Sequence, residues 1–144
     1  MTKKLALLLV LALAMAGTAR AQGADPIETR QAGQDLMAGT YSGIRAVVAD
    51  KGDVKTLEKP AAAMARWIKQ FPSQFPAGSD KGNTKALPAV WSDSAGFRKS
   101  ADDFVEAATK LSVLAKAGDT DGVATQVKVV GDACGACHKT YRQR

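Results

Sequence analysis

Four stripes of apolar residues constrain the fold of this 144-residue chain more than any other feature. Within each stripe the residues recur in steps of three and four, which places them on one face of an amphipathic helix. Strand-like alternation of apolar and polar residues is nearly absent. The pattern therefore predicts an all-α protein with four helices around one core. The stripes are Met37, Tyr41, Ile44, Val48; Leu57, Ala61, Met64, Ile68, Phe71; Phe97, Ala101, Phe104, Ala108, Leu111, Ala115; and Val123, Val127, Val130, Cys134, Cys137, Tyr141.

The connections between the stripes predict how the helices are arranged. Short segments rich in Gly and Asp, 50–53 and 117–122, follow the first and third stripes, and Asp119 or Thr120 suits the start of the fourth helix. The middle connection, 71–88, is long and contains three prolines. Because short loops join antiparallel neighbours, we expect an up-down-up-down four-helix bundle with this middle connection crossing one end.

The start of the chain has the features of a secretory signal peptide. Two lysines precede an apolar run over 5–16, and the small residues after it end in Ala-Arg-Ala, which predicts cleavage after Ala21. A membrane anchor is the alternative, but this run is short for a helix that crosses a bilayer, which needs about 20 residues. We therefore expect a signal peptide over 1–21 and one exported, periplasmic domain over 22–144, with no membrane span in the mature chain.

The charge of the mature chain argues against one class of partner. Three of the 20 lysines and arginines lie in the signal peptide, which leaves 17 basic against 14 acidic residues and a net charge near +3. No basic block is interleaved with aromatic residues, so nucleic acid is not expected as a partner. Paired carboxylates, a nucleophile with its base and a phosphate-binding loop are not recognisable either, so an enzyme is not expected.

The two cysteines and the single histidine of the chain lie within five residues, as Cys134, Cys137 and His138. The spacing C-x-x-C-H is the attachment signature of c-type haem. Residues three apart share a face of a helix, so both sulfurs can add to the two vinyl groups of one porphyrin. His138 can then present a ring nitrogen to the iron from the same side. The motif predicts one covalently attached haem c.

Three other kinds of site compete for the same motif. A redox dithiol usually accompanies a βαβ pattern, which this chain lacks. A disulfide is common in exported proteins, but between neighbouring helical turns it would close a very small loop and stabilise little. A zinc site needs a fourth ligand, and the chain has no other cysteine or histidine. Haem attachment is the prediction that meets no such obstacle.

The predicted topology also indicates what surrounds the motif. In an up-down-up-down bundle the end of the fourth helix lies beside the start of the first, the end of the second and the start of the third. The motif should therefore face 30–37, 67–71 and Trp91. Extending the first stripe backwards gives Gln34 and Arg30. The seam turns polar there, so something other than an aliphatic core fills this end.

The sequence resembles the class II cytochromes c, meaning cytochrome c-prime and its low-spin relatives. The resemblance covers nearly the whole mature chain and is carried by RQAGQDLM at 30–37, FPAGS at 75–79, PAVWSD at 88–93 and CGACHKTYR at 134–142. It implies a periplasmic four-helix bundle, often a homodimer, with one covalent haem. Cys134 and Cys137 would carry the thioethers and His138 the proximal bond to iron.

The resemblance leaves the sixth iron ligand open. Low-spin members of the family place a methionine of the first helix on the iron and transfer electrons. Cytochrome c-prime itself has an apolar residue there, which leaves the iron five-coordinate and able to bind nitric oxide or carbon monoxide. Counting four residues on from Arg30 gives Gln34, whereas aligning on the downstream run YSGIRAVVADKG brings Met37 to the ligand position.

On physical grounds, more than one residue could supply the sixth iron ligand. The mature chain has two methionines, Met37 and Met64, either of which is otherwise a core gap-filler, and it has no second histidine. Met37 lies about 15 Å into the first helix, a level that a haem on His138 can reach. Our main prediction is an electron carrier ligated by His138 and Met37 that serves unidentified redox partners. The alternatives are five-coordinate iron with Gln34 near the distal face, or ligation by Met64 or another group.

The remaining residues at this end have ordinary roles as alternatives to cofactor contacts. Arg30 is either a solvated helix residue or a salt-bridge partner of a haem propionate. Trp91 and Tyr141 pack on the porphyrin or simply in the core. Lys139 and Arg142 are expected to flank the exposed haem edge, where a mildly basic surface would steer an acidic partner.

Overall fold

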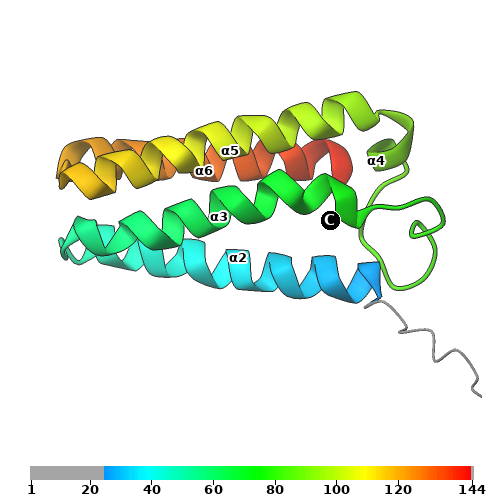
Figure 1. The fold of residues 1–144 in the computed structure, drawn as a ribbon, viewed down its shortest axis with the longest axis horizontal. Coiled ribbons are helices and arrows are strands. Elements are labelled where there is room, and N and C mark those ends of the chain that lie inside the picture. The colour runs from blue at the N-terminus through cyan, green and yellow to red at the C-terminus, as the bar shows by residue number, and fades with distance from the viewer. Residues whose placement is uncertain (1–24, 144) are drawn as a thin grey trace, which may run out of the picture.

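The computed structural model describes residues 25–143, so the predicted signal peptide lies outside the described residues. Four long helices form the body of the protein, and shorter helical turns lie in the connections (Figure 1). The long helices are α2 (Pro26–Ala49), α3 (Glu58–Gln70), α5 (Ser94–Ala117) and α6 (Thr120–Tyr141). The shorter elements are the 3₁₀ turns Val54–Leu57 and Phe71–Gln74 and the helix α4 (Ala89–Ser92).

The long helices run alternately up and down the bundle, as predicted. Short turns join α2 to α3 and α5 to α6 at one end, which we call the far end (Figure 1). The connection over 71–88, which we call the crossing segment, lies at the opposite end and leads through α4 into α5. We call this opposite end the loop end, and α6 finishes there. The fold therefore brings the C-x-x-C-H motif to the loop end.

Aspartate side chains fix where three of the long helices begin. Asp25 accepts a hydrogen bond from the backbone N–H of Ile27 at 2.8 Å, and Asp119 accepts one from Gly122 at 2.9 Å. Of the two residues expected to start the fourth helix, Asp119 is thus the cap. Asp93 accepts from Gly96 at 3.1 Å and interrupts the helical run, so α4 is separate from α5.

The predicted stripes form the core. Every stripe residue is buried or half-buried, and Ile44, Leu111, Val123 and Val130 are almost fully enclosed. Each such aliphatic side chain contributes roughly 1.5–3 kcal/mol through burial. The packing is uneven, because α5 packs closely on both α3 and α6, whereas α2 contacts its neighbours at few places. The bundle is therefore loosest along α2.

A second, smaller core closes the loop end. Its rings are Phe71, Phe75, Trp91, Phe97 and Tyr141, which we call the aromatic cluster. They contact one another edge-on or tilted, with centroids 5.0 Å apart for Phe75 and Phe97 and 5.2 Å apart for Phe97 and Tyr141. Such geometries add stabilisation beyond the buried area alone.

The end of the chain is fastened to the crossing segment. The N–H of Leu87 donates to the carbonyl oxygen of Tyr141 at 3.0 Å, and the N–H of Gln143 donates to that of Lys85 at 2.7 Å. Ala86 and Arg142 form an isolated antiparallel bridge between these bonds. The crossing segment thus holds the last turn of α6 in place. Among the described residues, no helix is long and apolar enough to cross a membrane.

Candidate haem site

The two cysteines lie one turn apart on α6 and border different parts of the core. Both are free thiols and half-buried. Cys134 packs against the main core and Cys137 against the aromatic cluster. Burial, with a smaller contribution from Cys134, raises the pKa of the Cys137 thiol to about 11, and burial raises the pKa of Cys134 as well. Both sulfurs are therefore neutral thiols at neutral pH in this fold.

His138 follows directly and lies exposed on the last turn of α6. Its Nδ1 is 3.4 Å from Nη1 of Arg142, one turn on. Partial desolvation of the ring and the nearby Arg142 cation both lower the pKa of His138. The neutral imidazole, which is the form that binds metals, is thus favoured.

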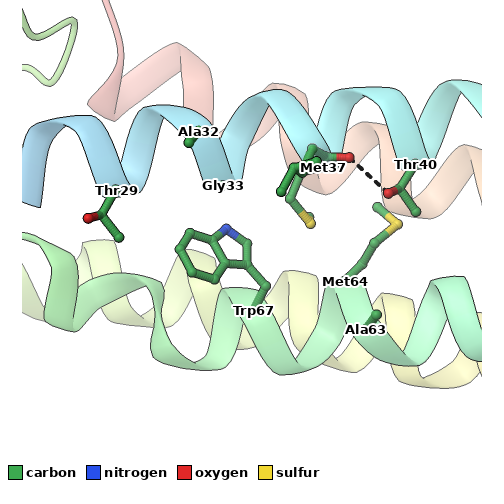
Figure 2. Close-up of a pocket in the computed structure, with 9 residues that line it drawn as sticks. Thr29, Ala32, Gly33, Met37, Thr40, Ala63, Met64 and Trp67 are labelled. Carbon is green, nitrogen blue, oxygen red and sulfur yellow. Dashed lines mark hydrogen bonds between the residues drawn. The ribbon is translucent and has the colours of Figure 1, made fainter. Parts of the chain in front are cut away.

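A cleft of about 400 Å³ opens between α2 and α3 (Figure 2). The side chains of Met37 and Met64 extend into it toward one another. The ring of Trp67 rests against Gly33, where a Cβ atom would clash with it. The cleft is lined by Thr29, Ala32, Gly33, Leu36, Met37, Thr40, Ala63, Met64 and Trp67.

The residues at this end fit a haem. The Nε1 of Trp67 is buried and has no hydrogen-bond partner among the described residues. An unpaired buried N–H is costly, and such a group calls for an acceptor from elsewhere. A haem would bring two carboxylates and a flat apolar ring to this loosely packed side of the bundle, within reach of two thiols spaced for its vinyl groups. The donor set and the unmet N–H are therefore both consistent with that cofactor.

Arg30 is buried, with 4% of its surface exposed, and holds the crossing segment. Its Nη1 donates to Ser79 Oγ at 2.9 Å and to the carbonyl of Gln74 at 3.2 Å. Its Nη2 donates to the carbonyl of Ser79 and to Thr84 Oγ1, both at 2.7 Å. The guanidinium also stacks over Phe75, 4.5 Å from the ring centroid. Arg30 is thus a structural residue here rather than a solvated one, and its contact with a propionate stays a prediction.

Trp91 and Tyr141 both belong to the aromatic cluster that borders Cys137. The Nε1 of Trp91 donates to the carbonyl oxygens of Phe75 and Pro76 at 3.2 and 3.3 Å. The hydroxyl of Tyr141 donates to Asp93 Oδ2 at 2.7 Å. The structure therefore brings both rings close to the motif, while their packing on a porphyrin stays a prediction.

One contact fixes the register of α2 against the antiparallel α6. The hydroxyl of Tyr41 donates to the carbonyl oxygen of Val127 at 3.0 Å. A Cβ atom at Gly131 would clash with the same hydroxyl, so Tyr41 reaches α6 between these two residues. Because the helices are antiparallel, a step toward the N-terminus of α2 corresponds to an equal step toward the C-terminus of α6.

This register distinguishes the two candidates for the sixth ligand position. Gln34 lies seven residues before Tyr41, which is two turns along the same face. Seven residues on from Val127 and Gly131 are Cys134 and His138, so Gln34 lies level with the motif. Met37 lies about 4.5 Å further from it along the axis at 1.5 Å per residue. Met37 is also turned toward α3, into the cleft (Figure 2).

A family model described as Cytochrome C' matches residues 25–142, nearly all of the described chain. The chain belongs to the cytochrome c' family. It is 36% identical to cytochrome c' of Rubrivivax gelatinosus over 83% of this chain and 95% of that protein. It is 35% identical to cytochrome c-556 of Agrobacterium tumefaciens strain B2A, covering 83% of this chain and 98% of the relative.

Solved structures of cytochrome c' share the fold of this family member. That of the Rubrivivax gelatinosus protein superposes with a TM-score of 0.74 at 36% identity, over 83% of this chain and 95% of that chain. A nitric oxide complex of a cytochrome c prime variant from Alcaligenes xylosoxidans gives 0.75 at 30% identity, over 83% and 94%. Family and fold confirm the predictions of a class II cytochrome, a four-helix bundle and one covalently attached haem c.

Sequence reasoning about this cytochrome missed the pair formed by Trp67 and Gly33. Trp67 lies beside Ile68, at the edge of a predicted stripe, and a glycine inside a helix is a usual sign of close approach. Each signal was present, but only the fold joins them across the cleft. Asp93 was likewise missed, because its contact with Tyr141 spans 48 residues.

Proposed function

We propose that this cytochrome is a periplasmic gas-binding protein with a five-coordinate haem. Cys134 and Cys137 attach the haem, His138 supplies the proximal nitrogen, and no methionine fills the opposite face. The observation that supports this best is the register of α2 on α6, in which Gln34 rather than Met37 lies level with the motif. When bound, the haem supplies an iron whose sixth position is open to nitric oxide or carbon monoxide.

The roles of the chain's own groups follow from their chemistry. Cys134 and Cys137 would hold the haem by adding one S–H each across a vinyl double bond, so that two C–S bonds would form and nothing would leave. The raised pKa values keep both thiols protonated until they react. His138 would bind the iron through a neutral ring nitrogen, and the half-buried Gln34 would cover the other side of the haem. The relatives named cytochrome c', one of them solved as a nitric oxide complex, support the same function.

The second candidate is the electron carrier ligated by His138 and Met37. The observation in its favour is that Met37 is 8% exposed and points into a cleft where its sulfur is free of polar partners. In the register of α2 on α6, however, Met37 lies further from the C-x-x-C-H motif than Gln34 does. The carrier therefore ranks second.

A visible spectrum of the oxidised protein separates the two functions. Five-coordinate iron should give a high-spin spectrum, and the reduced protein should take up carbon monoxide readily. A low-spin spectrum with the far-red methionine-to-iron band, converted to high spin by Met37→Ala, would instead establish the carrier. In the gas-binding case Met37→Ala leaves the spin state unchanged.

We also propose that the cytochrome forms a homodimer through the solvent face of α2. Leu36 is 73% exposed at the rim of the cleft, and none of the residues that line the cleft is charged. An exposed apolar patch of this kind is typical of an interface, and a second copy would pack the same face, with its own Leu36, against it. Sedimentation should give a dimer for the natural protein and a monomer for Leu36→Asp. The face consists of Thr29, Ala32, Leu36, Gly39, Thr40 and Gly43.

A further inference from the structure

We propose that Gln34 is the specificity-determining residue of this cytochrome, favouring nitric oxide over carbon monoxide by donating a hydrogen bond from its side-chain amide to the bound gas. The proposal rests on the proposed function, because it needs an open sixth position. The proposal goes beyond the proposed function because it assigns the discrimination between the two gases to one polar side chain.

The position of Gln34 carries the first step. It shares a face of α2 with Tyr41, whose hydroxyl touches α6, and it lies level with Cys134 and His138. It is half-buried, although a glutamine on a solvent face would be exposed. A side chain at this place would cover the side of a bound haem opposite His138.

The hydrogen bonds around Gln34 are the second observation that supports the proposal. Among the described residues, the amide of Gln34 takes part in no hydrogen bond, so its N–H groups are available. The neighbouring donors on α2 are already in use. Arg30 donates to the crossing segment, Thr40 to the carbonyl of Leu36 and Tyr41 to that of Val127. The unpaired N–H of Trp67 faces the α2–α3 cleft instead.

The chemistry of the gases carries the third step. Nitric oxide gains more negative charge than carbon monoxide when bound to reduced iron, so it accepts the stronger hydrogen bond. An amide has two N–H donors, and Gln34 can turn either toward the ligand without moving α2. A net hydrogen bond should slow nitric oxide release on the order of tenfold and carbon monoxide release by about twofold or less.

Dissociation rates of both gases from the reduced protein test the proposal. Gln34→Leu removes the donor at similar volume and should speed nitric oxide release about tenfold while leaving carbon monoxide within about twofold. The C–O stretching frequency of the carbon monoxide adduct should rise, because a donor near the oxygen lowers it. Gln31→Leu is the matched control, since Gln31 lies on the exposed side of α2 and donates to the carbonyl of Asn83.

The outcomes separate the two proposals. A low-spin natural protein that refuses both gases would overturn the proposed function and this inference together. A high-spin protein that binds both gases, but whose rate ratio and C–O stretch are the same in Gln34→Leu as in Gln31→Leu, would overturn the inference alone. Gln34→Glu keeps the shape and lacks the N–H donors at neutral pH, so it must shift the ratio in the same direction if Gln34→Leu fails to fold.

Discussion

The two ends of the bundle are built from different side chains, although the same four helices run through both. At the far end Ile44, Leu111 and Val123 are at most 1% exposed and belong to the main core, which is mostly aliphatic or small. At the loop end a buried arginine, a cluster of rings and an unpaired indole N–H share the interior with two half-buried thiols. At the loop end, by contrast, the N–H of Trp67 is buried without a hydrogen-bond partner among the described residues.

This difference shows that one bundle can divide stability and chemistry between its ends. Aliphatic packing needs nothing from outside the chain, so the far end can keep the helices in register on its own. The loop end is then free to hold groups that cost stability in the empty protein, such as the N–H of Trp67. Variants at the two ends should consequently separate folding from cofactor binding.

The largest effect is expected from removing both thiols at the loop end. Cys134→Ala combined with Cys137→Ala leaves no sulfur to bind the vinyl groups, so acidified acetone should extract all of the haem. The natural protein should keep its colour through the same extraction and weigh one haem more than its polypeptide. Colour retained by the double variant would contradict the assignment of both cysteines.

Leu111→Ala at the far end should have the next largest effect, on folding alone. Leu111 is 0% exposed, and deleting its side chain should lower the free energy of unfolding by about 3 kcal/mol through lost burial and the cavity left behind. Denaturant titration measures the loss, and the absorption spectrum should not change.

Val113→Ala, two residues away on the same helix, is the control for the far-end variant. Val113 is 62% exposed, so its truncation should change stability by no more than about 0.5 kcal/mol. A spectrum altered by Leu111→Ala, or equal losses in the two variants, would break the division between the ends.

The smallest effect concerns the pH dependence of the loop end. The hydrogen bond to Asp93, followed by burial, raises the pKa of Tyr141. The folded protein therefore favours the neutral phenol. This stabilisation is present below the ordinary tyrosine pKa of about 10, and it is lost as the pH rises through the pKa of Tyr141 in the folded protein. Tyr141→Phe keeps the ring and lacks the hydroxyl. Thermal unfolding should show that the variant is less stable than the natural protein at neutral pH. This difference in stability should disappear in alkaline solution.

If the stability difference between Tyr141→Phe and the natural protein stays constant across the alkaline range, ionisation of the Tyr141 hydroxyl has no effect on stability. Asp93 also caps α5, so Asp93→Asn is a poorer test of the same bond because it disturbs two contacts.

The far end could be predicted almost entirely from the sequence. Steps of three and four identified the buried residues, and Gly and Asp located the turns, because aliphatic packing on helices leaves a periodic signature. The structure was needed only to identify Asp119, rather than Thr120, as the residue that caps α6. The C-x-x-C-H motif was equally plain, since its three residues are adjacent in the chain.

The rest of the site could not be predicted, because its contacts join residues far apart in sequence. Arg30 was read as a helix residue or a propionate partner, and its four bonds to the crossing segment depend on how that segment folds. The proposal of Gln34 rather than Met37 beside the sixth position rests on the register of α2 against α6. No periodic pattern encodes that register, and one tyrosine hydroxyl reveals it.

The contacts between the end of α6 and the crossing segment can form only after the C-x-x-C-H motif has been synthesised. Synthesis runs from the N-terminus, so the C-x-x-C-H motif leaves the ribosome before Tyr141 and Gln143, which close the loop end. A chain cut before Tyr141 would keep the whole C-x-x-C-H motif. It would lose the bond to Asp93 and both backbone bonds to the crossing segment at once. The three residues of the motif are thus synthesised before the contacts that close the loop end can form.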